Sequence, residues 1–160
     1  MHALAVVDNS TCTMDPNAAP ANRWGIVSTG KVWEELLTSG VERFLGTSAG
    51  VGTQQRFAGV ATTGLSAIDL HTLPREEVLQ SMKNAVRKLV GPTDGGGGGG
   101  KVTTVCLGCA AMVGLEEAVS EVGTELGYPA GGLRVINGVK AGVLILEGLL
   151  KETYSSRVHS

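Results

Sequence analysis

The sequence predicts an α/β fold, a four-stranded parallel sheet flanked by helices. Four short apolar runs alternate with four longer segments in which apolar residues recur at helical spacing. The run 102–107 is rich in β-branched residues and lacks apolar–polar alternation, which is typical of a strand buried on both faces of a parallel sheet. This order of elements favours right-handed crossovers and a sheet covered by helices on both faces.

The first half of the chain contains two strand–helix units. The segment 24–29 is predicted as the first strand, and Gly30 and Lys31 begin the first helix. The segment 56–61 is a shorter second strand, and Pro74 marks the start of the next helix. The predicted buried faces of these helices consist of Trp33, Leu36, Leu37, Val41, Phe44 and Leu45, and of Val78, Met82, Ala85, Val86 and Leu89.

The second half repeats the pattern around a Gly-Cys pair. A helix is expected to follow the third strand directly, and Gly127 and Pro129 end it. The segment 133–136 is the fourth strand, and one more helix follows it. The predicted buried faces are Leu115, Ala118, Val119, Val122 and Leu126 in the third helix, and Val139, Val143, Leu146, Leu149 and Leu150 in the last.

The chain is predicted to contain one domain, residues 24–150, with a linker at 1–23 and a polar tail at 151–160. Residues 1–23 begin with a short apolar piece, Ala3 to Val7, which is too short for the core of a signal peptide. The hexaglycine at 95–100 is interpreted as a loop and not as a site.

Composition narrows the possible partners. The net charge is −2, lysine and arginine form no basic stripe, and only 4% of the residues are aromatic, so nucleic acid is not expected as a partner. No apolar run approaches the length that spans a bilayer, and we expect no membrane association. With three cysteines and no disulfide framework, we expect a reduced, cytoplasmic protein.

Small and polar residues follow all four predicted strands. Because the carboxyl ends of parallel strands meet at one edge of a sheet, we expect these residues to line one crevice. They are Ser28-Thr29-Gly30, Thr62-Thr63-Gly64, Gly108-Cys109 and Asn137-Gly138.

Cys109 is the candidate acid or base of this crevice. At a strand end and a helix start, unpaired amides and the positive end of the helix favour a thiolate that faces a bound ligand. The alternative is a structural role, since free cysteine is commonly a small buried apolar residue.

The hydroxyl residues of the strand ends also have two interpretations. Ser28, Thr29, Thr62 and Thr63 suit a small carboxylate or a ring imide, but serine and threonine also cap helices routinely. Ligand contact is favoured for Ser28 and Thr29, and more weakly for the threonine pair. Met112 is expected to fill the core.

Metal, redox and nucleotide chemistry have weaker support. Cys106 and Cys109 form a C-x-x-C, but Cys106 lies within the predicted strand and the three histidines show no ligand spacing, so no metal site is predicted. Gly25 to Lys31 and the hexaglycine with Lys101 resemble phosphate loops. Each is followed by valine where a metal-binding serine or threonine belongs.

Taken together, these motifs resemble the aspartate/glutamate/hydantoin racemase superfamily, most closely its fungal hydantoin or allantoin racemase-like branch. The resemblance covers nearly all of residues 22–150. The matching blocks are Gly25-Ile-Val-Ser-Thr-Gly-Lys-Val-Trp33, Phe57-Ala-Gly-Val-Ala-Thr-Thr-Gly-Leu65, Leu107-Gly-Cys-Ala-Ala-Met112 and Ile136-Asn-Gly-Val-Lys-Ala-Gly142.

The resemblance implies a flavodoxin-like C-terminal lobe of a two-lobed enzyme without metal or organic cofactor. In such an enzyme two cysteines face opposite sides of a substrate's stereocentre, and one removes a proton while the other returns one. Cys109 matches the C-terminal cysteine and Ser28-Thr29 a substrate-contacting position. The amides of Gly108 to Ala110 would hold a carboxylate or ring oxygen.

Two departures from the family pattern qualify this expectation. The N-terminal lobe and its cysteine have no counterpart here, and Cys12 does not match that cysteine. Asn137 replaces the acidic residue usual in the family's last block.

The leading hypothesis is therefore a truncated, cofactor-independent racemase for hydantoin, allantoin or amino-acid substrates. The alternative is a non-catalytic small-ligand binding protein or a truncated racemase-like product. Two copies could pair and present Cys109 from both sides of a substrate. A lone lobe should also leave an apolar face uncovered.

Overall fold

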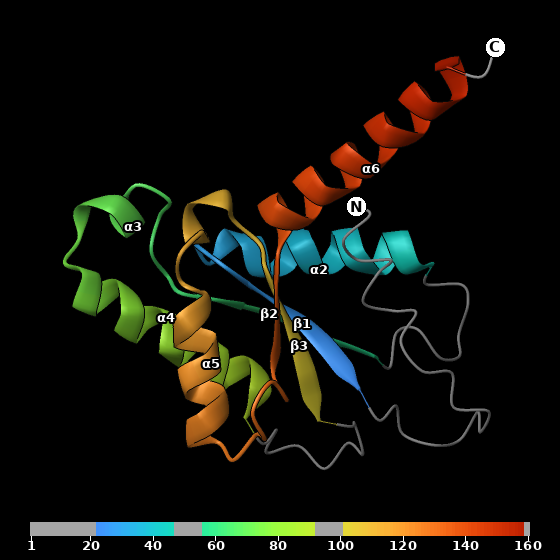
Figure 1. Ribbon diagram of the computed structural model, residues 1–160. Helices are drawn as coiled ribbons and strands as arrows, with labels where there is room; N and C mark the ends of the chain where they lie inside the picture. The colour runs from blue at the N-terminus through green and yellow to red at the C-terminus, as the bar shows by residue number, and fades with distance from the viewer. Residues whose placement is uncertain (1–21, 47–55, 92–100, 159–160) are drawn as a thin grey trace, which may run out of the picture.

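A computed structural model describes residues 22–46, 56–91 and 101–158. Its centre is a four-stranded sheet in the order β2-β1-β3-β4, with every neighbouring pair parallel (Figure 1). The predicted α/β class and all four predicted strands are confirmed. The strands are β1 (Arg23–Ser28), β2 (Phe57–Thr62), β3 (Val102–Leu107) and β4 (Arg134–Asn137).

One face of the sheet carries the main core. Helices α4 (Arg75–Val90) and α5 (Glu116–Glu125) pack there side by side, and the short α3 (Asp69–Thr72) precedes α4 (Figure 1). Their predicted apolar residues are buried with Val27, Val105 and Met112 of the strands and loops, except Leu126, which is exposed. Gly25 of β1 leaves room for this packing, because a Cβ there would lie 2.6 Å from Leu89 Cδ1.

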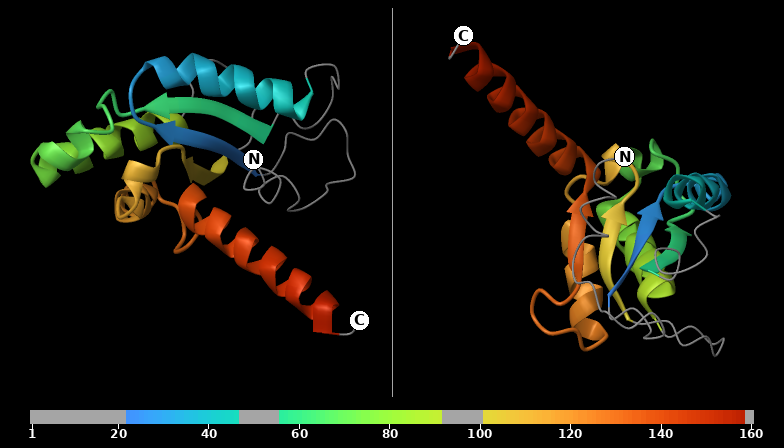
Figure 2. Two further views of the ribbon diagram at one scale, coloured as in Figure 1. Left: turned by 90° about the horizontal axis from the view of Figure 1, so that it is seen from above. Right: turned by 90° about the vertical axis from the view of Figure 1, so that its right-hand side faces the viewer.

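Helix α2 (Val32–Leu45) lies on the opposite face, over β2 and β1 (Figure 2). Val41 of α2 packs with Trp24, Ile26 and Cys106 in a smaller core. The predicted buried face of this helix is only partly buried. Trp33, Leu36 and Phe44 are 43% to 56% exposed.

The last helix, α6 (Gly138–Val158), leaves the body at the β4 edge and projects away from it (Figures 1 and 2). The prediction that Val139, Val143, Leu146, Leu149 and Leu150 form a buried face is wrong, since all five are exposed. None of the other described elements packs along the length of α6. Within the described residues, these five side chains form an uncovered apolar face of the kind that the sequence led us to expect. The helix also continues beyond residue 150, through most of the predicted tail.

Several predictions fall outside the described residues. They concern the apolar piece from Ala3 to Val7, the rest of the linker with Cys12, and the hexaglycine at 95–100. Within the described residues, no helix is long and apolar enough to cross a membrane.

Candidate active site at the carboxyl edge of the sheet

The carboxyl ends of β1 and β3 lie side by side at the centre of the sheet. The chain runs from β1 outward to β2 and then returns past β1 to β3 and β4, so the direction of winding changes between β1 and β3. In open α/β sheets, ligands bind outside the strand ends at such a switch point. The residues at the ends of these two strands, Ser28 to Gly30 and Gly108 to Ala110, flank this position.

Gly108 brings the two strand ends into contact. Its amide donates a hydrogen bond to the Val27 carbonyl oxygen at 2.8 Å. A Cβ on Gly108 would lie 2.8 Å from Ile26 Cγ2 and 3.3 Å from Ser28 Oγ. Only glycine therefore lets the loop that carries Cys109 pass so close to Ser28. Because the Gly108 amide is bonded within the sheet, it is not free to bind a ligand oxygen.

Cys109 is half-buried and packs at the border of the main core. The expectation that an α-helix follows it directly is wrong. A single 3₁₀ turn, η2 (Ala110–Met112), comes next, and α5 begins only at Glu116. The positive end of α5 is thus displaced from the thiol. In the described part of the chain, the amides of Cys109 and Ala110 have no hydrogen-bond acceptor, so these two remain available to a ligand.

Cys106 and Cys109 do not form a dithiol pair. The Cys106 side chain belongs to the α2-side cluster, whereas Cys109 packs against the opposite cluster. Burial raises the pKa of the Cys106 thiol to about 12, so this thiol stays protonated. The arrangement agrees with the prediction that the C-x-x-C spacing is not a redox motif.

The hydroxyl residues at the strand ends are either buried or hydrogen-bonded to other residues of the chain. Ser28 and Thr29 are buried. Thr62 Oγ1 donates to Glu34 Oε1 of α2 at 2.9 Å. Thr63 Oγ1 accepts a hydrogen bond from the Leu65 amide at 3.2 Å, which closes a local turn. Gly30 is half-buried at the start of α2. The hydroxyl groups of Thr62 and Thr63 thus form hydrogen bonds within the described part of the chain.

Glu116, in the first turn of α5, joins three parts of this edge. Its Oε1 accepts hydrogen bonds from Asn137 Nδ2 at 2.9 Å and Lys140 Nζ at 2.7 Å. Its Oε2 accepts one from the Gly114 amide at 2.7 Å. The hydrogen bond from Lys140, followed by the backbone bond, lowers the pKa of Glu116 to about 2. A carboxylate is therefore fixed between the cysteine loop, β4 and α6.

Asn137 ends β4 and caps α6. Its Oδ1 accepts hydrogen bonds from the amides of Val139 and Lys140 at 3.0 and 3.1 Å, which satisfies two donors at the helix start. The resemblance implies an acidic residue at this position. In this structure a carboxylate lies beside the position instead, because Asn137 donates a hydrogen bond to Glu116.

A cavity of about 420 Å³ lies beside this cluster, between β4 and α6. Its lining is mainly apolar, and Glu116, Asn137 and Lys140 provide the polar groups at its edge. The predicted site residues Cys109, Ser28, Thr29, Thr62 and Thr63 are not among its lining residues. The four strand ends thus share one edge of the sheet, but the cavity occupies only the β4 side of that edge.

The parallel sheet order places this chain among the open α/β folds, whose ligands usually bind at the carboxyl edge of the sheet. The family model for Asp/Glu/Hydantoin racemase matches residues 4–146, and the chain belongs to this family. The chain is 33% identical over 127 residues to an uncharacterized protein of Schizosaccharomyces pombe, covering 79% of this chain and 45% of that protein.

A solved structure shows the same fold. Allantoin racemase from Klebsiella pneumoniae superimposes with a TM-score of 0.51 at 21% sequence identity, over 82% of this chain and 44% of that one. The chain thus spans less than half the length of both proteins. This coverage accords with the predicted resemblance to one lobe of a racemase.

Proposed function

We propose that this chain is one lobe of a cofactor-independent racemase and that Cys109 is its acid/base residue. The observation that carries the proposal is the position of Cys109. It follows the central strand β3, next to the β1 end, and is half-buried rather than enclosed. Family membership supports an isomerase reaction on a small molecule. Hydantoins, allantoin and amino acids are the proposed substrates, and the cytoplasm is the proposed location.

In the proposed step, the Cys109 thiolate removes the proton on the carbon next to a carbonyl group. The carbon–hydrogen bond breaks, a sulfur–hydrogen bond forms, and the electron pair moves onto the carbonyl oxygen. The unpaired amides of Cys109 and Ala110 are the donors available to the developing oxyanion. Return of a proton from the thiol restores the carbonyl compound.

A single thiol acts on one face of the substrate. If the proton returns from the same sulfur, the configuration is kept, and only exchange with solvent hydrogen results. Inversion needs a second acid/base group on the other face. In this proposal that group comes from another polypeptide, and a second copy that presents its own Cys109 is one source. The isolated chain is expected to catalyse exchange faster than racemisation.

The test is α-proton exchange in heavy water, followed by proton NMR with a hydantoin, allantoin and an amino acid as substrates. The natural chain should exchange the proton faster than buffer, and Cys109→Ser should return the rate to the buffer value. Cys106→Ala is the matched control, because it removes the thiol on the other side of the sheet and should leave exchange intact. Exchange that is equal in the natural chain and in Cys109→Ser refutes the proposal.

A non-catalytic, ligand-binding function is the second candidate. It is favoured by the cavity between β4 and α6, whose lining residues do not include Cys109. Titration calorimetry with the same three compounds distinguishes the two functions. Binding without Cys109-dependent exchange supports the binding protein.

A further inference from the structure

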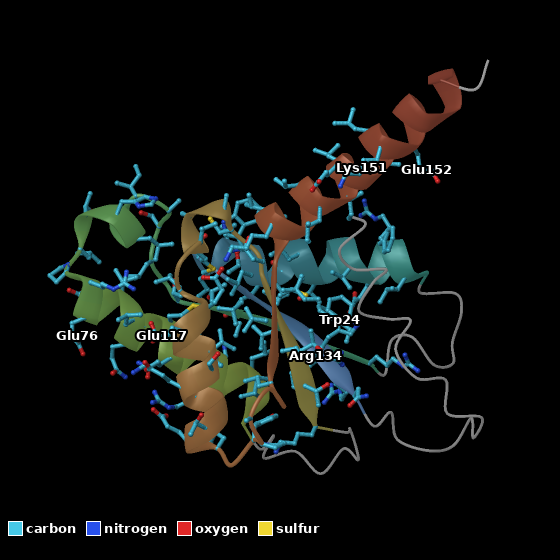
Figure 3. All side chains as sticks on the ribbon, in the orientation of Figure 1. Trp24, Glu76, Glu117, Arg134, Lys151 and Glu152 are labelled. Carbon is cyan, nitrogen blue, oxygen red and sulfur yellow. The ribbon has the colours of Figure 1, made fainter. Side chains whose placement is uncertain are left out.

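Helix α6 exposes apolar side chains far beyond its attachment to the body. Its attachment lies in the first turns, where Ala141, Leu144 and Ile145 line the cavity against β4. Lys151 and Glu152 mark the section that projects beyond the other elements (Figure 3). A helix with apolar residues on more than one side is normally buried by more than one neighbour. Within the described residues, β4 and the cavity edge cover only one side of it.

Four of the exposed residues form a regular seam, which we call the α6 seam. They are Val139, Val143, Leu146 and Leu150, and they are 45% to 64% exposed. Their spacing of four, three and four residues is that of the apolar positions in a coiled coil. At about 100° per residue, the seam points away from the side of α6 that lines the cavity. It is therefore an exposed surface separate from the cavity.

We propose that the α6 seam is a dimer interface in which α6 of a second copy packs antiparallel against it. The two-fold axis passes between Val143 and Leu146. In this register Val143 packs on Leu146 of the second copy, and Val139 packs on its Leu150. All four apolar residues of the seam are then used on both copies.

Charge complementarity argues for a second copy and for the antiparallel orientation. Lys140 and Glu147 lie on the same side of the seam, each one residue after an apolar position. A two-fold antiparallel pair brings Lys140 of one copy beside Glu147 of the other, twice. Residues at these flanking positions set partner and orientation in coiled coils. Lys140 and Glu147 already bond to Glu116 and Lys151, but an ammonium and a carboxylate can each make further bonds.

The size of the seam predicts a weak dimer. The seam spans about 17 Å of helix, so its contact area falls below the roughly 800 Å² per partner that is typical of a stable complex. The dimer should therefore dissociate on dilution. This inference does not depend on the racemase proposal, because it is tested by mass and by cross-linking.

The first test is light scattering coupled to gel filtration over about a hundredfold range of concentration. The natural chain should move from monomer to dimer mass as its concentration rises. Leu146→Glu should remain a monomer throughout. Glu152→Lys is the control, since Glu152 is exposed, does not line the cavity and lies about 120° around the helix from Leu146. It should dimerise like the natural chain.

The second test fixes the register. Chains with Val143→Cys are mixed with chains with Leu146→Cys and oxidised. The natural chain is oxidised in parallel to show any cross-link that its own cysteines form. A disulfide needs Cβ atoms within about 4.5 Å, so the proposed register predicts a cross-link between the two different chains.

A natural chain that is monomeric at every concentration overturns the proposal and leaves the seam to a different polypeptide. So does a Leu146→Glu variant that dimerises normally, or a Glu152→Lys control that fails to do so. Circular dichroism establishes that each variant retains the helix content of the natural chain.

Discussion

Replacing Glu116 by glutamine tests the carboxylate that joins the cysteine loop to α6. The fall of its pKa from 4.5 to about 2 corresponds to about 3 kcal/mol of preferential interaction in the folded state. The side chain is 26% exposed, and solvent screening lowers this figure. We expect about 1 to 2 kcal/mol of the free energy of unfolding to depend on this charge.

The pH dependence of this stabilisation follows from the direction of the Glu116 pKa shift. Because folding depresses the pKa of Glu116, its contribution is fully present above pH 4.5 and is lost as the pH falls towards about 2. Glu116→Gln should therefore be less stable than the natural chain at neutral pH, and the difference should shrink across this window.

Urea unfolding, measured by circular dichroism at several pH values, gives both curves. Glu117→Gln is the matched control, since it neutralises the exposed neighbouring residue and keeps the Glu116 network. A stability difference between Glu116→Gln and the natural chain that stays constant from neutral pH to pH 2 would refute the reasoning.

Three further predictions concern packing and thiol chemistry. In thermal melts, Gly25→Ala should lower the free energy of unfolding by about 1 to 3 kcal/mol, because the new Cβ would lie 2.6 Å from Leu89 Cδ1 and 3.0 Å from the Gly59 carbonyl oxygen. Gly40 has open space around it, so the control Gly40→Ala should not destabilise the chain. Tyr128→Phe should cost about 1 kcal/mol in urea unfolding, because the Tyr128 hydroxyl donates to the Val102 carbonyl oxygen at 2.8 Å. Iodoacetamide labelling read by peptide mass spectrometry should modify Cys109 before Cys106 in the folded chain, since Cys106 is buried and its pKa is raised to about 12; equal rates without denaturant would contradict this order.

The strands and the α4 and α5 helices could be predicted because their residue patterns match surfaces that the chain itself covers. The helical spacing of Val78, Met82 and Val86 predicts a buried face, and the sheet supplies the surface that buries it. The same reasoning failed for α6. Its apolar spacing indicates that the helix has a surface to bury, but the pattern contains no information on whether this chain provides the covering element.

The candidate site was predicted at the level of strand ends but not of individual contacts. Cys109 and Gly108 lie where the order of elements predicts. The 3₁₀ turn after Cys109 was missed because Leu115 and Ala118 continue the helical spacing and conceal the interruption at Gly114, whose φ is +91°. The role of Glu116 was missed because its side-chain partners, Asn137 and Lys140, are 21 and 24 residues away in sequence.

The three hydrogen bonds of Glu116 have a mechanical consequence. Its two oxygens connect the first turn of α6, through Lys140, with the turn at Gly114 that follows the cysteine loop. Among the described residues, α6 contacts the body mainly near its start, at β4, so a small force at its far end exerts a large torque at its base. A molecule that binds the far end of α6 would thus exert a force, through the Glu116 carboxylate, on the backbone at Gly114, five residues from Cys109.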